Sequence, residues 1–516
     1  MERDKLIFEE FLRWVKKTPG KLAILDGKKS LTYQELYEKS CQLASTLNET
    51  DITSRYIFIL GNKASESIIA ILGALFSGFT YVALDINQPA SRLDHIFSVL
   101  SPAILIFTGI SPRLKREIKQ MGESPNYILD LAGDLTTDVF KNTQRVKLKN
   151  KPILPSSYPD EQIAYTLFTS GSTGQPKGVC ISHRAARAAL RMFQKHIGLK
   201  PQDIIANQAA LCFDLSVFDI FATLNAGATL CLIPPETTAL PDRFFQTIAG
   251  HKAISLFTTP STLDFLLTNT TASQTNPYLK KILLSGEPVS LDLLKKIYNT
   301  FHNDIEIWNL YGATEIPYAL AQPIKKNSND HINNFSLRGD EVEIKIRAAS
   351  FENQNDTPII GELLVKGPAV LSGYIHKNNQ DMSSPLIEGG WYPTGDLASM
   401  DSKNQITLHG RADRQIKIKG HRVELDEIEF QLATCPEIQE AAVVFFKETQ
   451  EIHAYLVLTP HNRSEQETLE IIENFCESGL PSMFCPSKFN IIENMPYTVS
   501  GKKDRKSLIK TELVNA

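Results

Sequence analysis

The segment YTLFTSGSTGQPKGV, Tyr165–Val179, is the most informative stretch of this sequence. An apolar run typical of a buried strand leads directly into a loop of glycine, serine and threonine, which closes with Pro176, Lys177 and Gly178. Glycines allow backbone N–H groups to converge on an anion, hydroxyl groups add further donors, and a lysine adds a positive charge. The segment therefore predicts a phosphate-binding loop.

Two other interpretations of this loop fit its residues less well. The P-loop pattern GxxxxGK[ST], started at Gly171, requires glycine at position 176 and serine or threonine at position 178, where the chain has Pro176 and Gly178. A flexible linker can have the same Ser/Gly-rich composition. A linker is not expected directly after a strand, however, nor is it expected to close with Pro-Lys-Gly.

Length and composition set broad limits on function. The chain has 516 residues, 42% of them hydrophobic, and its 54 basic and 58 acidic side chains give a formal net charge of −4. This length predicts about two to four domains. The near-neutral balance argues against a protein that coats nucleic acid or is held on anionic lipid by bulk charge. The seven cysteines include no CxxC pair, which indicates reduced thiols rather than a zinc ribbon or a disulfide framework.

The sequence shows no clear targeting or membrane segment. Its first residues, MERDKLIFEEF, have no apolar core of the signal-peptide type. Residues 67–84 are uncharged, close to the lower length limit of a spanning helix, but Gly73, Ser77 and Gly78 interrupt the run. We expect a buried helix that stops at Gly78, followed by a buried strand, Tyr81–Leu84. These features favour a cytoplasmic protein without membrane insertion.

Strand-like apolar runs alternate with amphipathic helical runs along most of the chain, which predicts an α/β architecture. The expected elements are strands at Tyr56–Leu60, Ala103–Thr108, Ile163–Phe168, Thr229–Ile233, Ile254–Thr258 and Ile282–Leu284 and helices at Ala185–Phe193 and Leu291–Phe301. After about Gly410 the sequence becomes charge-dense, and two strands, Ala441–Phe446 and His453–Leu458, and a helix, Glu465–Cys476, follow. We therefore predict a large N-terminal domain of layered sheets and helices, 1–411, and a small α+β C-terminal domain, 412–516, behind a charged hinge.

The phosphate-binding loop closely resembles that of the adenylate-forming superfamily, which contains acyl- and aryl-CoA synthetases, luciferases and the amino-acid adenylation domains of nonribosomal peptide synthetases. Further segments resemble the family's motifs in the family's order: LTYQEL from Leu31, FDLSVFDIF from Phe213, NLYGATE from Asn309, GELLVKGPAVLSGY from Gly361, YPTGD from Tyr392, GRADRQIKIKGHRVELDEIE from Gly410 and SGKKDR from Ser500. The departures are modest. Ala83 and Ala313 stand where the family often has proline, and Ser500 stands where it often has asparagine. The resemblance covers nearly the whole chain and implies the family's fold, with a mobile C-terminal lid domain.

The resemblance implies a first half-reaction in which a substrate carboxylate attacks the α-phosphate of ATP and pyrophosphate leaves. Such a reaction depends mainly on positioning and on neutralising charge. By the same resemblance Thr314 donates to the α-phosphate, and Glu315 binds Mg²⁺, a hard cation that prefers carboxylate oxygen. The residues that would hold the β- and γ-phosphates are Thr169, Ser170, Gly171, Ser172, Thr173, Gly174 and Lys177.

Other matched positions would bind the nucleoside. Asp396 would accept both ribose hydroxyls, with Arg411 nearby. Asn309 would bond the amino edge of adenine, Tyr311 would stack on the ring, and Gly286 also belongs to the matched ATP-binding positions. Taken singly, an aspartate or arginine near a glycine indicates a turn or a solvated ion pair. The ordered set of motifs favours the nucleotide-binding interpretation.

Two residues near the C-terminal domain would act in the reaction cycle. Lys502 matches the lysine that bridges the substrate carboxylate and the phosphate during adenylation, where a compact ammonium neutralises two anions. Its basic run, Lys502–Lys510, is otherwise typical of a solvated helix end or a nucleic-acid patch, and the family match favours neither. Asp413 matches the hinge about which the small domain rotates between half-reactions.

Asp214, within FDLSVFD, indicates the substrate class. A carboxylate in an apolar pocket is costly unless a cation pairs with it. In amino-acid-activating relatives this position binds the α-ammonium group, whereas fatty-acyl and aryl-acid relatives typically lack it; the alternative is a capping or turn aspartate. The other pocket residues, carried over position by position, are Leu215, Phe218, Phe257, Leu283, Ser285, Leu310, Tyr318 and Ala319. They hold no charge and leave a small apolar space, which disfavours acidic and basic amino acids.

This pocket looks most like that of stand-alone prolyl-carrier-protein ligases, so proline is the first candidate. D-alanine–carrier-protein ligases are a close second, because NQAALCFDLSVFDI from Asn207 resembles their corresponding segment. Eleven residues follow Arg505, and no HHxxxDG-type condensation motif occurs. We therefore expect the acceptor to be the phosphopantetheine thiol of a separate carrier protein, with Lys417–Gly420 lining its approach after hinge rotation.

Two other functions remain as alternatives. An acyl- or aryl-CoA synthetase of the same superfamily is opposed by Asp214. A catalytically silent nucleotide-binding or scaffold protein is opposed by the intact set of Lys177, Glu315, Asp396 and Lys502.

Overall fold

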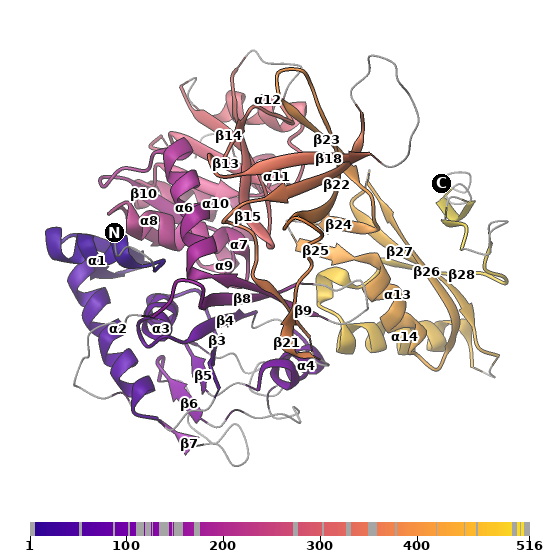
Figure 1. The fold of residues 1–516 in the computed structure, drawn as a ribbon. Helices are drawn as coiled ribbons and strands as arrows, with labels where there is room; N and C mark the ends of the chain where they lie inside the picture. Colours follow the sequence, from indigo (N-terminus) through magenta and orange to yellow (C-terminus); the bar gives the residue numbers. More distant parts are fainter. Residues whose placement is uncertain are drawn as a thin grey trace.

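A computed structural model shows a large N-terminal domain and a small C-terminal domain, and the predicted α/β class with an α+β C-terminal domain is confirmed (Figure 1). The structure describes residues 6–50, 54–85, 88–101, 104–109, 118, 125, 127–133, 144–146, 148, 158–169, 176–271, 277–301, 304–326, 332–348, 359–376, 379–418, 421–447, 449–460, 463–497, 503–505 and 507–509. The predicted site residues Ser170, Gly171, Ser172, Thr173, Gly174 and Lys502 lie outside these ranges.

Sheet A of the large domain has nine strands and supports most of the candidate site. Their order is β17 (Leu337–Arg338), β15 (Ile316–Ile324), β14 (Glu306–Ala313), β13 (Lys281–Ser285), β12 (Ser255–Thr258), β10 (Ile204–Asn207), β11 (Thr229–Leu232), β1 (Leu22–Asp26) and β2 (Lys29–Thr32). The run from β14 to β1 is parallel, while β15 pairs antiparallel with β14. Parallel strands bring their carboxyl ends to one edge, where α/β proteins bind ligands.

Sheet B, also with nine strands, holds both ends of the predicted phosphate-binding loop. Its order is β21 (Asn379–Ser383), β20 (Gly373–His376), β9 (Lys177–Ser182), β8 (Ile163–Thr169), β4 (Thr80–Leu84), β3 (Tyr56–Leu60), β5 (Ile104–Phe107), β6 (Tyr127–Asp130) and β7 (Gln144–Arg145). Strands β8 and β9 are antiparallel, and their register pairs Thr169 with Lys177. The first and last residues of the predicted loop therefore lie opposite each other.

A third, five-stranded sheet C leads into the small domain. Its order is β16 (Asn334–Phe335), β23 (Ile406–Arg411), β22 (Tyr392–Met400), β19 (Gly361–Lys366) and β18 (Glu343–Ala348). The antiparallel register of β22 and β23 pairs Asp396 with Arg411. Two residues predicted to lie near the ribose are therefore neighbours on adjacent strands.

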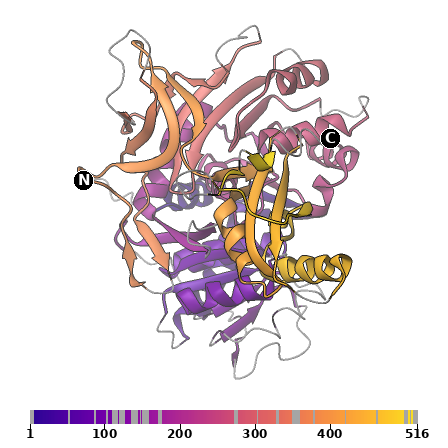
Figure 2. The same cartoon turned by 90° about the vertical axis from the view of Figure 1, so that its right-hand side faces the viewer.

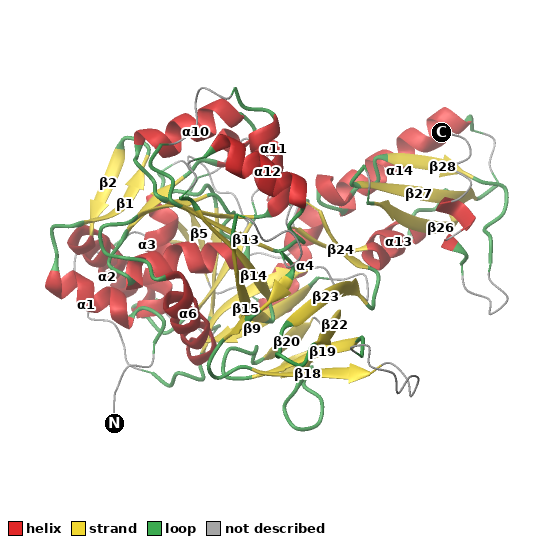
Figure 3. Cartoon of the chain, turned by 90° about the horizontal axis from the view of Figure 1, so that it is seen from above, coloured by secondary structure: helices red, strands yellow, loops and turns green. Residues whose placement is uncertain are grey.

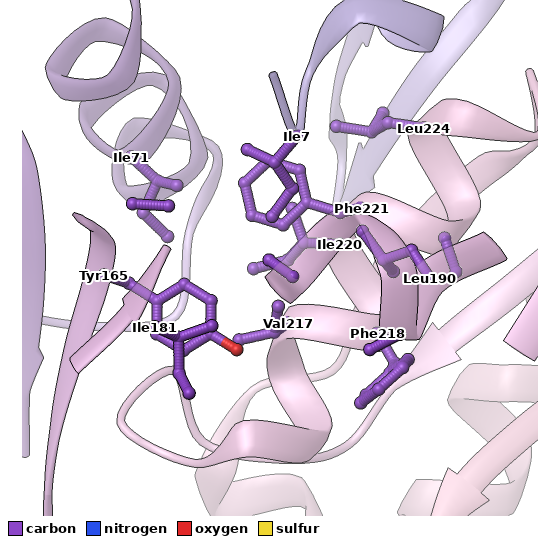
Figure 4. Packing of buried hydrophobic residues seen from close by; sticks show 14 of the residues in the cluster. Ile7, Ile71, Tyr165, Ile181, Leu190, Val217, Phe218, Ile220, Phe221 and Leu224 are labelled. Carbon is purple, nitrogen blue, oxygen red and sulfur yellow. The ribbon is translucent and has the colours of Figure 1, made fainter. Parts of the chain in front are cut away.

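Helices cover the sheets of the large domain. They are α1 (Glu9–Lys17), α2 (Tyr33–Asn48), α3 (Ser65–Phe76), α4 (Ala90–Leu100), α6 (His183–Ile197), α7 (Asp214–Val217), the π-helical turn η1 (Phe218–Ala222), α8 (Thr223–Asn225), α9 (Pro235–Thr238), α10 (Pro241–Gly250), α11 (Pro260–Thr268) and α12 (Leu291–Thr300). Figure 4 shows how the α7–η1–α8 segment packs between sheet B and α6: Val217 lies near Tyr165 and Ile181, and Phe218 lies near Leu190. This packing positions Asp214 at the start of α7.

The uncharged stretch of residues 67–84 is part of this core, as predicted. Helix α3 is almost wholly buried and ends at Phe76, and Gly78 adopts a φ of 77°, which turns the chain into the buried strand β4. Among the described residues, none of the helices combines the length and apolar character needed to cross a membrane.

The small domain has its own sheet and core. It consists of the hairpin β24 (Gln415–Ile418) and β25 (His421–Glu424), then α13 (Leu425–Ala433), β26 (Ile438–Phe446), β27 (Glu451–Leu458), α14 (Glu465–Gly479), the 3₁₀ turn η3 (Ser482–Phe484) and β28 (Lys488–Ile491). Figure 3 shows the small domain beside the large one, with β24 between them, and Figure 2 shows it in front of the large domain. The predicted strands 441–446 and 453–458 and the helix 465–476 are confirmed within β26, β27 and α14.

Candidate functional site

A cavity of about 1560 Å³ lies at the carboxyl ends of the sheet A strands and continues to the small domain. It is lined by predicted site residues from all three sheets and from α7: Thr169, Asp214, Leu215, Phe218, Phe257, Ser285, Gly286, Asn309, Leu310, Tyr311, Thr314, Asp396, Arg411 and Asp413. The hairpin residues Lys417, His421 and Arg422 also line it. The structure therefore brings distant parts of the chain together in one cavity: Thr169 and Arg411 are 242 positions apart (411 − 169 = 242).

Asp396 lies at the centre of a polar cluster at one end of the cavity. The hydroxyl of Tyr311 donates to Oδ2 of Asp396 at 2.5 Å, and Nη1 of Arg411 donates to Oδ1 at 3.1 Å. Arg411 also donates to Asp413 through Nε at 2.8 Å and through Nη2 at 2.5 Å. One guanidinium thus joins the carboxylate predicted to accept the ribose hydroxyls to the predicted hinge residue.

Asn309, in the middle of β14, and Gly286, directly after β13, lie on the cavity wall. The amide nitrogen of Asn309 donates to the backbone oxygen of Ile332 at 2.9 Å and to Oδ1 of Asn333 at 3.0 Å. These bonds fix the orientation of the amide, which leaves its Oδ1 to accept a hydrogen bond from an adenine amino group. Gly286 has a φ of 95°, a conformation that favours glycine and allows the backbone to approach a ligand closely.

Glu315, in the turn between β14 and β15, is fully buried and surrounded by donors. Nη1 of Arg422 donates to both Oε1 and Oε2 at 2.8 Å, and the hydroxyl of Tyr374 donates to Oε1 at 2.8 Å. Nζ of Lys177 lies 3.5 Å from Oε1 and 4.0 Å from the centre of the Tyr374 ring. Burial alone would raise the pKa of Glu315, but Arg422 and then Lys177 outweigh it and lower the pKa to about 2. Glu315 is therefore ionised at neutral pH.

A single anionic carboxylate beside Lys177 fits Mg²⁺. This ion is commonly held by one or two carboxylates together with substrate phosphates, rather than by a cage of protein ligands. Within the described parts of the chain, no three His, Cys, Asp or Glu side chains gather as an all-protein metal site would require. The residues present thus match a metal ion that is bound jointly with a nucleotide.

Asp214 is a second carboxylate at the cavity, partly buried at the N-terminus of α7. The hydroxyl of Thr314 donates to its Oδ2 at 3.0 Å, and the backbone N–H of Leu215 donates to its Oδ1 at 2.8 Å. Burial raises the pKa of Asp214, and the nearby Lys417 opposes this rise. Burial likewise lowers the pKa of Lys417, opposed by Asp396 and Asp214. A cationic group of a ligand bound in the cavity would therefore be attracted to this carboxylate.

Aromatic rings fill the space behind Asp214. Phe193 of α6, absent from the predicted pocket, lies 5.1 Å from Phe218, 6.0 Å from Phe257 and 5.9 Å from Tyr318, measured between ring centroids. Nδ1 of His196 and the hydroxyl oxygen of Tyr318 share a hydrogen bond of 2.7 Å. We call these five residues the aromatic wall.

Three of the predicted pocket residues do not reach the cavity. Of that set, all of which the structure describes, Leu283, Tyr318 and Ala319 are not among the residues that line it. Tyr318 belongs to the aromatic wall, where its ring packs against Phe193 and its hydroxyl is hydrogen-bonded to His196. The amphipathic pattern of 185–193 predicted the helix that carries Phe193, but nothing in that pattern indicated that the ring would pack against residues from 218 to 318.

The two domains contact each other through buried ion pairs. Nη1 of Arg92 on α4 lies 2.5 Å from Oε1 of Glu427 on α13, and their side chains are only 6% and 4% exposed. The hydroxyl of Ser91 donates to the backbone oxygen of Ser478 at 2.8 Å. With the Arg422–Glu315 pair, these contacts hold the hairpin β24–β25 against the cavity.

The residues that follow Lys502 pack against the small domain. Nζ of Lys503 donates to the backbone oxygen of Ala441, and Nη2 of Arg505 lies 2.8 Å from Oε2 of Glu429. Both contacts are with elements of the small domain itself, β26 and α13.

Comparisons with known proteins agree with this arrangement. The family model "AMP-binding enzyme" matches residues 11–375, and the model "AMP-binding enzyme C-terminal domain" matches residues 427–502. Zwittermicin A synthase ZmaJ from Bacillus cereus is 30% identical over 516 residues, which covers 97% of this chain and 94% of that protein. Bacitracin synthase 1 from Bacillus licheniformis is 31% identical over 513 residues, which covers 98% of this chain but only 9% of that protein.

Solved structures share the fold. The adenylation domain AlmE of Vibrio cholerae, in complex with glycyl-adenosine-5'-phosphate, superimposes with a TM-score of 0.84 at 20% identity, over 100% of this chain and 99% of that chain. The chain spans 9% of the length of bacitracin synthase 1 and 48% of the anguibactin system regulator of Vibrio anguillarum. Taken with the two family models, the site geometry leads to one assignment. The chain belongs to the AMP-binding enzyme family, as an adenylate-forming enzyme of the nonribosomal peptide synthetase type, and such enzymes use ATP with Mg²⁺.

Proposed function

We propose that this protein activates a small apolar amino acid as its adenylate and then transfers it to the phosphopantetheine thiol of a separate carrier protein. The observation that carries this proposal is Asp214, a partly buried carboxylate on the cavity wall that accepts hydrogen bonds from the Thr314 hydroxyl and the Leu215 backbone N–H. A cationic ligand group would compensate its charge. The α-ammonium group of an amino acid supplies that charge, and a fatty or aryl acid does not.

In the proposed first half-reaction, the substrate carboxylate attacks the α-phosphate of ATP and pyrophosphate leaves. The loop residues 169–174 and Lys177 bind the β- and γ-phosphates, and Thr314 donates to the α-phosphate. Glu315 would hold Mg²⁺, which supplies charge neutralisation on the phosphate oxygens when bound. Lys502 bridges the two reacting anions.

The nucleoside is held at the other end of the cavity. Asp396, positioned by Tyr311 and Arg411, accepts the ribose hydroxyls. Asn309 accepts from the adenine amino group, and Gly286 allows the backbone to approach the base. These assignments rest on the family match of each position and on its location on the cavity wall.

In the proposed second half-reaction, the small domain (412–516) has rotated about Asp413. The thiol sulfur attacks the carbonyl carbon of the aminoacyl adenylate, the bond from that carbon to the phosphate oxygen breaks, and AMP leaves. The hairpin β24–β25 lines the cavity in the structure, through Lys417, His421 and Arg422. This location supports an orientation of the small domain that suits thiol transfer, because the predicted thiol approach includes Lys417.

For the amino acid itself, proline is the first candidate and D-alanine the second. The aromatic wall supports a small side chain, because Phe193 and Tyr318 occupy space that a longer one would need. The complex of AlmE with glycyl-adenosine-5'-phosphate is consistent with a small substrate in this fold. Apart from Asp214, the predicted pocket residues hold no charge, which disfavours acidic and basic side chains.

Amino-acid-dependent ATP–pyrophosphate exchange, measured with the twenty amino acids and D-alanine, tests this function. We expect exchange with small apolar amino acids, and its loss in Asp214→Asn. Asp340→Asn is the matched control, because Asp340 pairs with Lys195 on the exposed surface. Exchange with no amino acid, together with activity on fatty or aryl acids and coenzyme A, would establish an acyl- or aryl-CoA synthetase instead.

A further inference from the structure

Besides Lys177, whose Nζ lies 3.5 Å from Oε1, Glu315 has two candidate cations, Mg²⁺ and Arg422, and the structure shows Arg422 in place. The side chain of Glu315 has no exposed surface, and Arg422 approaches from the small domain. A single nitrogen, Nη1, lies 2.8 Å from Oε1 and 2.8 Å from Oε2. This nitrogen is equidistant from the two oxygens, as a cation chelated by a carboxylate is. Arg422 thus occupies the face of the carboxylate that a metal ion would use.

The two cations cannot share this carboxylate. Oε1 also accepts from the hydroxyl of Tyr374 at 2.8 Å and lies 3.5 Å from Nζ of Lys177, so its remaining space is limited. Mg²⁺ binds oxygen at about 2.0–2.1 Å with near-octahedral geometry. A guanidinium and a divalent ion on the same two oxygens would also repel each other across a few ångströms of buried space.

The position of Arg422 depends on the orientation of the small domain. Arg422 lies on β25, and its partner in the antiparallel register is Lys417 on β24. Side chains directly opposite each other in such a pair lie on the same face of the hairpin. One face therefore brings Arg422 to Glu315 and Lys417 close to Asp396 and Asp214, all three of them carboxylates of the large domain. Rotation of the hairpin would remove both cations together.

We propose that Arg422 is a positioning residue that replaces Mg²⁺ at Glu315, so that metal binding and this orientation of the small domain exclude each other. This inference rests on the proposed role of Glu315 as the Mg²⁺ ligand. A buried carboxylate without a cation is strongly unfavourable. Lys177 of the large domain lies 3.5 Å from Oε1 and compensates part of this charge, so a second cation, Mg²⁺ in the first half-reaction and Arg422 in the second, further stabilises Glu315. Departure of the metal ion with pyrophosphate then permits the hairpin to enter, which orders the two half-reactions.

The Arg92–Glu427 pair provides a matched control. It also joins the two domains and is buried, and both of its residues pair with each other rather than with Glu315. Removing the charge of Arg92 should weaken the same orientation of the small domain without abolishing the competition at Glu315.

Hydrogen–deuterium exchange of the hairpin amides in the full-length protein tests the proposal. Pyrophosphate is held constant while Mg²⁺ is raised from none to saturation. In the wild type we expect the hairpin to exchange about tenfold faster with Mg²⁺, which corresponds to a shift of about 1.4 kcal/mol. Arg422→Met should exchange fast at every Mg²⁺ concentration. Arg422→Lys should keep part of the Mg²⁺ dependence, and Arg92→Met should exchange faster at the start yet remain Mg²⁺-dependent.

Isothermal titration of Mg²⁺ into the protein with pyrophosphate separates the two possible failures. If Mg²⁺ binds and Glu315→Gln abolishes the binding, while the exchange of the wild-type hairpin does not change with Mg²⁺, the exclusion proposed here is wrong and the metal role of Glu315 stands. If Glu315→Gln binds Mg²⁺ as the wild type does, the metal role of Glu315 is itself wrong. Arg422→Met should bind Mg²⁺ several-fold more tightly than the wild type, and equal or weaker binding would overturn the proposal.

Discussion

Thr314 donates a hydrogen bond of 3.0 Å from its hydroxyl to Oδ2 of Asp214, a residue 100 positions earlier in the chain. Asp214 is the proposed site of the α-ammonium group, and Thr314 directly precedes Glu315, the proposed metal ligand. One hydroxyl therefore connects the amino-acid end of the cavity to its phosphate end. A change at Thr314 should then affect amino-acid binding as well as nucleotide chemistry.

Thr314→Val tests this connection. Loss of a hydrogen bond to a charged group costs about 1.5–3 kcal/mol, so we expect the KM for the amino acid to rise about tenfold or more. Thr314→Ser, which keeps the hydroxyl, should stay close to the wild type. Pyrophosphate exchange at varied amino acid and then at varied ATP measures both constants. A change confined to the ATP constants would show that the bond to Asp214 does not matter for substrate binding.

Lys502→Ala should abolish adenylation but spare thiol transfer from preformed aminoacyl-AMP. The expected ammonium of Lys502 neutralises the carboxylate and the phosphate only while they are brought together. Exchange measures the first step, and transfer from synthetic adenylate to the carrier thiol measures the second. Lys503→Ala is the control, because Lys503 bonds the backbone of Ala441 within the small domain. Equal loss of both steps in Lys502→Ala would contradict the assigned role.

Arg92→Met should impair the second half-reaction selectively. Breaking one side of a buried ion pair costs about 3–5 kcal/mol, and here the cost falls on the domain orientation in which Arg92 contacts Glu427. We expect thiol transfer to slow by about tenfold or more, while pyrophosphate exchange stays within about twofold. The double variant Arg92→Glu with Glu427→Arg should recover part of the transfer rate. If exchange and transfer fall together, the pair stabilises the protein rather than one orientation.

The aromatic wall should set the upper size of the substrate. Phe193→Leu removes ring volume behind Phe218, Phe257 and Tyr318, so these rings can move back and deepen the pocket. A methylene group in an apolar pocket is worth about 1–3 kcal/mol. We therefore expect the exchange activity with leucine, relative to that with the preferred substrate, to rise about tenfold. An unchanged profile in a folded variant would place the specificity elsewhere.

The buried His183 should make stability fall in acid. It lies at the start of α6, where its Nδ1 accepts from the backbone N–H of Ile7 at 3.3 Å, and burial lowers its pKa to about 3 from the usual 6.5. Between these values the unfolded chain binds the proton and the folded protein does not. This side chain therefore removes up to about 1.4 kcal/mol of stability per pH unit as the pH falls from about 6.5 toward 3.

Thermal unfolding of the wild type and of His183→Asn over a pH series measures this contribution. Asparagine keeps an acceptor for the Ile7 N–H but has no proton to bind in this range. The stability advantage of the wild type should be largest near neutral pH and shrink as the pH falls. Parallel pH profiles for the two proteins would show that His183 is not the titrating group.

Local patterns in the sequence were sufficient to predict much of the fold. Strands such as Tyr56–Leu60 and the helix ending before Gly78 follow from apolar runs and from a glycine that tolerates positive φ, and both are confirmed. These features depend on neighbours within a few residues, which a single sequence contains. The motif order then indicated the family, which the family models confirm.

Side-chain contacts within the site could not be predicted from local sequence patterns. Phe193 and Tyr318 are 125 positions apart (318 − 193 = 125), and neither position shows a local pattern that indicates the other. The amphipathic run 185–193 predicted the helix but not what its buried face would meet. Packing of this kind depends on how α6 lies against sheet A, which is a property of the whole folded domain.

The sequence by itself determined the kinds of chemistry present: a loop suited to phosphate, a carboxylate suited to Mg²⁺, and an aspartate in an otherwise apolar pocket. Only the tertiary structure decided which polar and charged side chains are in contact. It placed Arg422 on Glu315, 107 positions away, and Thr314 on Asp214. The physical reason is that a buried charge must be compensated at short distance. Chain-distant segments supply that compensation, and the orientation of the small domain determines which of them are near.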